Sequence, residues 1–106
     1  NLKDSNYIGN SVKEYKFNTY KEILELVKTY NDITVIGEKK DLNYFMSNGV
    51  KCININDKID EYNNVLVLDN NMSNELRYKA YSSTLNDLII YDMSNTPDSI
   101  NDLEII

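Results

Sequence analysis

Four acidic residues follow short apolar runs of the chain, either directly or two residues later: Glu38, Asp57, Asp69 and Asp92. Carboxylate oxygens and water are the ligands that Mg²⁺ prefers in proteins. If the runs end at one edge of a sheet, Glu38, Asp69 and Asp92 are candidate ligands of a magnesium ion. Aspartate, asparagine and serine also satisfy the free N–H groups that open a helix. Helix capping explains the same positions without convergence, and it is the interpretation that we favour.

Other residue types that carry chemistry are scarce. The chain has no histidine, no tryptophan and one cysteine, Cys52, which stands in the apolar run 50–55 and is expected to be a small buried hydrophobe. It has three glycines, and Gly37-Glu38-Lys39-Lys40 offers only one of them, so neither a dinucleotide fingerprint nor a P-loop is present. We therefore expect no cofactor other than a possible Mg²⁺, and favour a protein that is not an enzyme.

Charge and hydropathy bound the partners. Eleven basic residues against seventeen acidic ones give a formal charge of −6. Nucleic-acid affinity comes from clustered lysine and arginine, so a nucleic-acid partner is not expected. No apolar run approaches the roughly 20 residues that span a bilayer. The sequence predicts no membrane span and a cytoplasmic protein.

Apolar residues recur with the two periods that distinguish strands from helices. Apolar or alternating runs predict strands at 12–17, 33–36, 52–55, 65–68 and 88–91. Apolar residues at helical spacing, with capping residues before them, predict helices at 19–30, 41–48 and 73–83. Asp41 is expected to cap the second helix and Asn48-Gly49 to end it. At most a helical turn or two is expected at 57–62, and Thr96-Pro97 is typical of a helix start.

Strands that alternate with helices predict a three-layer α/β fold with a mainly parallel sheet of about five strands, Rossmann-like or flavodoxin-like. The 106 residues are expected to form one domain, with 1–11 resembling a linker into it. Because the chain begins with Asn1, we expect a fragment of a longer polypeptide.

Two segments are candidates for binding. Asn70 and Asn71 follow the run 65–68, where ligands of parallel α/β sheets gather. The end of the chain, from Leu103 to Ile106, is strongly apolar, and we expect it to dock on the domain or on a protein partner.

The stretch Val65–Met72, which reads VLVLDNNM, resembles the third strand and following turn of response-regulator receiver domains. In that family an aspartate at the strand end accepts a phosphoryl group, so the resemblance implies that Asp69 stands at the acceptor position. Ser73 stands where the family has proline, and no lysine follows the run 88–91. The resemblance therefore implies a degenerate receiver that binds proteins without being phosphorylated.

The stretch Ile33–Asp41, with Gly49-Val50 after it, resembles the opening of the Toprim fold of primases, topoisomerases and small nucleases. The resemblance implies that Glu38 matches an acid of the Mg²⁺ site. The family's later pair of acids would fall at Asp69 and at Asn71, where the second acid is replaced by asparagine.

The leading hypothesis is a non-enzymatic, receiver-like protein-interaction or regulatory domain, whose partner is another protein or the rest of the same polypeptide. One alternative is a Toprim-like, Mg²⁺-dependent nucleic-acid enzyme domain. A second is a small structural subunit of a larger assembly, for which the apolar end from Leu103 to Ile106 is the candidate contact. The segment 35–41 is also similar to part of the rotor-associated F subunit of V-type ATPases.

Overall fold

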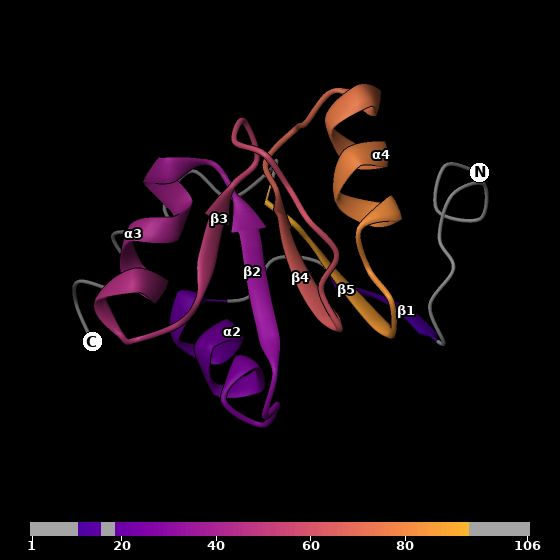
Figure 1. Ribbon diagram of the computed structural model, residues 1–106. Helices are drawn as coiled ribbons and strands as arrows, with labels where there is room; N and C mark the ends of the chain where they lie inside the picture. The colour runs from indigo at the N-terminus through magenta and orange to yellow at the C-terminus, as the bar shows by residue number, and fades with distance from the viewer. Residues whose placement is uncertain (1–10, 16–18, 94–106) are drawn as a thin grey trace.

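Strands and helices alternate along the chain, and they lie close to the segments expected from the sequence (Figure 1). The structure, a computed structural model, describes residues 11–15 and 19–93. Its elements are β1 (Ser11–Tyr15), α2 (Tyr20–Val27), β2 (Ile33–Gly37), α3 (Lys39–Ser47), β3 (Cys52–Asn54), β4 (Asn64–Asp69), α4 (Asn74–Ser82) and β5 (Asp87–Asp92). Ser11, expected to be the last linker residue, is the first residue of β1; the helix start at Thr96-Pro97 lies outside the described residues.

The strands form one sheet in the order β1-β5-β4-β2-β3, and every neighbouring pair is parallel. This confirms the predicted α/β fold with a parallel sheet. Without β1, the order β3-β2-β4-β5 is the flavodoxin-like order 2-1-3-4, and β1 occupies the place beside β5 that the fifth strand takes in that fold. The sheet therefore has a flavodoxin-like arrangement in which the edge strand comes first in the chain.

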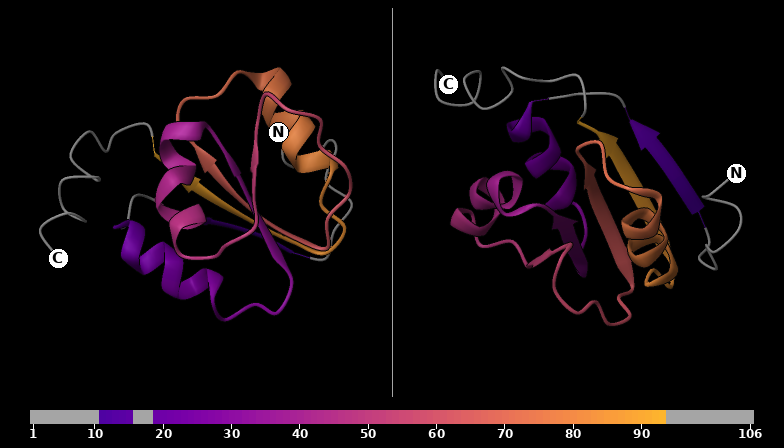
Figure 2. Two further views of the ribbon diagram at one scale, coloured as in Figure 1. Left: turned by 60° about the vertical axis from the view of Figure 1, so that its left-hand side comes forward. Right: turned by 90° about the horizontal axis from the view of Figure 1, so that it is seen from above.

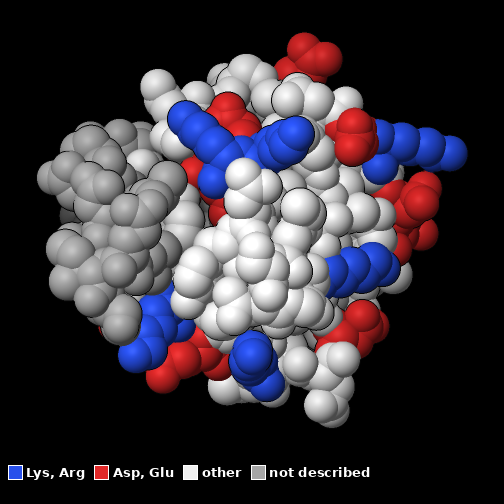
Figure 3. Space-filling model, turned by 90° about the vertical axis from the view of Figure 1, so that its left-hand side faces the viewer, with Lys and Arg blue, Asp and Glu red and all other residues white. Residues whose placement is uncertain are grey.

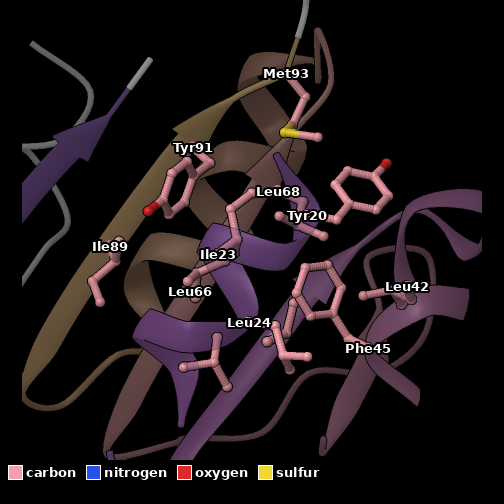
Figure 4. Close-up of a cluster of buried hydrophobic side chains, with 12 residues drawn as sticks. Tyr20, Ile23, Leu24, Leu42, Phe45, Leu66, Leu68, Ile89, Tyr91 and Met93 are labelled. Atoms are coloured by element: carbon pink, nitrogen blue, oxygen red, sulfur yellow. The ribbon is translucent and has the colours of Figure 1, made fainter. Parts of the chain in front are cut away.

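Helices cover both faces of the sheet, as Figure 2 shows: α2 and α3 lie on one face and α4 on the other. Alternate residues of the central strands point to opposite faces. Leu66 and Leu68 of β4 therefore pack under α2 and α3, while Val65 and Val67 pack under α4. Figure 4 shows the first of these clusters, in which the Tyr20 and Phe45 rings lie 5.6 Å apart between their centroids.

The first helix begins as predicted and ends earlier. The Thr19 hydroxyl accepts a hydrogen bond from the Glu22 N–H, and the Glu22 carboxylate accepts one from the Thr19 N–H, which is a capping box. Helix α2 ends at Val27 rather than at Tyr30 because the next residues form a tighter turn, with the Tyr30 N–H donating to the Val27 carbonyl. Tyr30 still packs against the core, which accounts for the apolar period that continues beyond the helix.

Helix α3 begins three residues earlier than predicted. Its N-cap is Glu38, whose side chain makes no capping hydrogen bond, so the prediction that Asp41 caps this helix is wrong. Asp41 lies in the first helical turn and is buried. The predicted end is confirmed, because Gly49 follows the helix with φ +77°, a conformation that glycine adopts without strain.

The connection between β3 and β4 contains no helix. Residues 55–63 form an irregular loop whose Ile59 and Tyr62 side chains pack on the α4 face of the sheet. The Lys79 ammonium group of α4 donates hydrogen bonds to the carbonyls of Ile55 and Asp57, which ties the loop to that helix. Asp57 therefore caps no helix, contrary to the capping interpretation at that position.

Candidate functional site

The strand order reverses direction between β2 and β4, and the crevice at this point is where ligands bind in open parallel sheets. From β2 the chain moves outward to β3, then returns to β4 on the other side of β2. Gly37 and Glu38 stand at the carboxyl end of β2, and Asp69, Asn70 and Asn71 at that of β4. The topology therefore brings four of the predicted site residues to one edge of the sheet: Glu38, Asp69, Asn70 and Asn71.

Gly37 allows the carboxyl ends of β2 and β4 to approach closely. A Cβ atom at this position would lie 3.1 Å from the Leu68 Cβ, which is closer than such atoms ordinarily pack. Because Leu68 is itself held in the central strand, it has little room to move away. The absent side chain thus sets the spacing of the two strands that carry the candidate residues.

Asp69 forms a bidentate ion pair with Arg77 of α4. The Arg77 Nε atom donates to Asp69 Oδ2 at 2.8 Å, and Nη2 donates to Oδ1 at 3.3 Å. The Asp69 Oδ1 atom also accepts from the Met72 N–H at 3.0 Å. Asp69 is only 7% exposed. Both carboxylate oxygens are therefore engaged by the chain itself.

Local sequence explains how Arg77 reaches the strand end. Asn71 adopts a left-handed conformation, φ +58°, which asparagine tolerates better than most residues, and this turns the chain sharply after β4. Ser73 then caps α4 by accepting from the Leu76 N–H, as predicted. Arg77 lies one turn into the helix and faces back toward β4. The hydrogen bond to Asp69 raises the pKa of the Arg77 guanidinium, and the charges of Asp69, Tyr81 and Asp92 act in the same direction.

Asp92 lies beside Asp69 at the end of the neighbouring strand. The two residues are paired in the parallel register of β4 and β5, so their side chains project from the same face of the sheet. Asp92 is exposed, and its charge favours the protonated form of Arg77. Arg77 is thus paired with Asp69 and also lies within the electrostatic influence of Asp92.

A second buried carboxylate, Asp41, lies across the sheet from this pair. Its Oδ1 atom accepts a hydrogen bond from the Tyr20 hydroxyl at 2.7 Å, and its Oδ2 atom accepts one from the Asn70 side-chain amide at 3.5 Å. Asp41 is 3% exposed. Asn70, predicted as a binding residue, therefore helps to hold α3 against the end of β4, whereas Asn71 is exposed to solvent.

The predicted three-carboxylate magnesium site is not assembled. In the ranges 11–15 and 19–93, no three histidine, cysteine, aspartate or glutamate side chains gather closely enough to hold a metal ion. Asp69 turns toward α4 and pairs with Arg77, while Glu38 lies at the start of α3, which packs on the opposite face. The other predicted binding residues, Leu103 and Ile106, lie outside the described residues.

The partners of the two buried carboxylates, Arg77 and Tyr20, are not among the predicted site residues. Arg77 is the single arginine of the chain and stands four residues after the Ser73 cap, so its position on the first exposed turn of a helix after Asp69 was a usable signal. Nothing in the local sequence links Tyr20 with Asp41, because they meet only when α2 and α3 pack side by side.

Cys52 is half-buried at the start of β3. Burial raises the pKa of its thiol to about 11, so the thiol stays protonated near neutral pH. This agrees with the expected small hydrophobe rather than with a nucleophile.

A pocket of about 410 Å³ lies at the opposite edge of the sheet, between the carboxyl ends of α2 and α3. Lys28, Asp32 and Lys51 are among its lining residues, and it is remote from the strand-end carboxylates. Among the described elements, no helix is long and apolar enough to cross a membrane. Comparison with known proteins returns no match to a family model, to a curated protein or to a solved structure.

Proposed function

We propose that this chain is a non-enzymatic, receiver-like protein-interaction or regulatory domain of a longer cytoplasmic polypeptide. The observation that carries the proposal is the ion pair between Asp69 and Arg77. At the edge of the sheet where this fold places its chemistry, the central carboxylate is bound to a cation that the chain itself supplies.

A phosphoryl acceptor needs an accessible carboxylate oxygen and a cation that offsets the charge of the incoming phosphoryl group. Asp69 is nearly buried and both of its oxygens accept hydrogen bonds, so neither oxygen is freely accessible. The cation beside it, Arg77, is already paired with this carboxylate. Charge-assisted bonds of the bidentate kind are among the strongest in proteins. The ion pair therefore favours a rigid strand end that supports a binding surface. It disfavours a catalytic site at this strand end.

The Toprim-like alternative would require Asp69 and Glu38 to share a magnesium ion. Asp69 faces α4 and Asn71 replaces the second acid, and both features count against a two-acid site. The other alternative, a small structural subunit, would also bind a protein partner, but the contact with that partner would be permanent.

Incubation with a small phosphodonor and Mg²⁺, followed by intact-mass measurement, tests the proposal. We expect the wild type to gain no phosphoryl group. A mass gain that disappears in Asp69→Asn and persists in the matched variant Asp92→Asn would overturn the proposal in favour of an active receiver. Mg²⁺-dependent cleavage of labelled DNA, lost in both Asp69→Asn and Glu38→Gln, would overturn it in favour of the Toprim-like alternative.

A further inference from the structure

The outer side of α3 and the adjoining edge strand β3 form a surface that has no acidic residue, which we call the neutral face. Between Leu42 and Asn56 the sequence contains one charged residue, Lys51, although charged residues make up 26% of the chain. Figure 3 shows uncharged atoms across the centre of this side and charged groups around its margin. The side chains that are exposed or half-buried here are Asn43, Tyr44, Met46, Ser47, Asn48, Val50, Cys52 and Asn54.

Two features of the neutral face are unusual for surface exposed to water. Met46 is 50% exposed, one of two large hydrophobic side chains in the described ranges that are exposed to this degree; the other is Leu85. The single charge is drawn to one side, because the Lys51 Nζ atom lies 4.7 Å from the centre of the Tyr62 ring in the loop on the α4 face. The neutral face therefore exposes an apolar side chain and carries little charge of its own.

The β3 strand leaves one row of backbone groups without a partner strand. Among the strands that the structure describes, it stands last in the sheet order and pairs with β2 alone. The Lys51 carbonyl and the Ile55 N–H bond to β2, so the backbone groups of the intervening even-numbered residues point away from the sheet. The outward groups include the N–H and carbonyl of Cys52 and the N–H of Asn54. An open row of this kind is a template for pairing with another strand.

We propose that the neutral face is a dimer interface in which the β3 strands of two copies of this chain pair antiparallel about a two-fold axis at Cys52. In this register the two Cys52 residues exchange N–H to carbonyl bonds. Each Asn54 N–H then donates to the Val50 carbonyl of the other copy. The two sheets become continuous, and the contact is self-complementary, as a two-fold interface requires.

The same axis brings the α3 helices together. It is perpendicular to the sheet, so both copies of α3 lie on one face and run antiparallel. Strands are spaced about 4.8 Å apart, so helices that cover the last strands of their own sheets approach within the roughly 8–10 Å at which helices pack. This places the exposed Met46 side chains in the helix contact, where they lose their contact with water.

Charge favours a second copy as the occupant. The chain has a net charge of −6, so most pairings of its surface bring like charges together, and the neutral face does not. Antiparallel α3 helices also place Lys39 and Lys40, at the start of one helix, near the carboxyl end of the other. Cations are favourable at that end because the helix dipole is negative there. Within residues 42–56, the charges of a self-pairing near the axis are the two Lys51 side chains, each held over a Tyr62 ring, and the ends of the α3 pair are complementary.

The inference deepens the proposed function, because it names the partner that one surface of the interaction domain takes. It is tested separately from that function. A monomeric chain would overturn the dimer and leave the phosphodonor result untouched.

Sedimentation equilibrium of the full chain over a range of concentrations tests the dimer. Met46→Lys places like charges across the axis, and we expect it to weaken association at least about tenfold. The matched control, Leu85→Lys, makes the same change at an exposed leucine outside the neutral face and should leave association unchanged. A wild type that remains monomeric, or equal weakening by the two variants, would overturn the proposal.

Amide hydrogen exchange locates the contact on β3. In the dimer, the N–H groups of Cys52 and Asn54 should exchange more slowly as the concentration rises, while the Ile53 N–H, which faces β2, is protected throughout. Met46→Lys should abolish the concentration dependence. Concentration-dependent association with no change at these two amides would show that another surface pairs, and would overturn the assignment to β3.

Discussion

Removal of Arg77 should lower the free energy of unfolding more than removal of Asp69. Asp69 is almost buried, whereas the Arg77 side chain is 29% exposed and can return to water when its partner is removed. Loss of Arg77 leaves a buried carboxylate with fewer donors, and this is the costlier change. The pair is thus mainly a device that keeps the Asp69 charge inside the fold.

Arg77→Gln should lower the free energy of unfolding by about 1–3 kcal/mol, measured by urea denaturation. Asp69→Asn should cost less, because asparagine still accepts from the Met72 N–H and the freed guanidinium becomes solvated. Lys58→Gln, an exposed control, should stay within about 0.5 kcal/mol of wild type. Equal values for Arg77→Gln and Lys58→Gln would contradict this account of the pair.

Tyr81 should make the free energy of unfolding depend on pH in the alkaline range. Burial, followed by the nearby charge of Asp69, raises the pKa of its phenol from 10.0 to about 12. Below pH 10 both states are protonated. Between those values the unfolded chain loses the proton that the folded chain keeps, so the free energy of unfolding falls as pH rises.

Tyr81→Phe should flatten the decline in the free energy of unfolding between pH 10 and about 12, by up to about 1.4 kcal/mol per pH unit. The comparison is made by urea denaturation of both proteins across this range, with the difference at pH 8 as the baseline. Parallel profiles for wild type and variant would show that Tyr81 is not responsible.

At the scale of the elements, the hydrogen bond between Tyr20 and Asp41 joins α2 to α3. These helices share one face of the sheet, and α3 also presents the neutral face. Tyr20→Phe removes a donor from a buried carboxylate and should cost about 1–3 kcal/mol of unfolding free energy. Tyr44→Phe, a change in the neighbouring ring whose centroid is 5.8 Å away, should cost under about 0.5 kcal/mol. Similar losses in urea denaturation would mean that the Asp41 contact does not hold the helices together.

The end of α3 depends on the left-handed conformation of Gly49. Nothing lies within 4 Å of the position that a Cβ would take, so only backbone strain opposes a side chain there. Gly49→Ala should destabilise the protein by about 1 kcal/mol, while Gly49→Asn should cost less because asparagine tolerates positive φ. Thermal unfolding of the two variants measures the difference. A Gly49→Ala variant as stable as the wild type would contradict the strain.

At the scale of the whole molecule, apolar periodicity was sufficient to predict the parallel sheet and the positions of its central strands. The buried run Val65–Leu68 and the Thr19 capping box are both local signals, and both are confirmed. Strand order is not local, because it depends on which strands pair after long connections. The place of β1 beside β5 and the helix-free connection 55–63 were therefore not predicted.

The candidate site was only partly predictable for the same reason. The strand-end positions of Asp69 and Asp92 follow from the apolar runs before them, and the structure places both at one edge. The partner of Asp69 comes from the face of α4 that turns toward the sheet, and that of Asp41 from a helix 21 residues earlier in the chain. Acidic residues at strand ends thus indicate where charge gathers, while tertiary packing decides what neutralises it.

Arg77 offsets the charge of Asp69 from within the chain, so Mg²⁺ should gain no site at this carboxylate. Thermal unfolding of the wild type with and without millimolar Mg²⁺ tests it most directly, because a metal that binds only the folded state raises the melting temperature. We expect Mg²⁺ to leave the melting temperature of the wild type unchanged. It should likewise leave the melting temperature of Asp69→Asn unchanged. A Mg²⁺-dependent rise in the wild type that is lost in Asp69→Asn would contradict the claim.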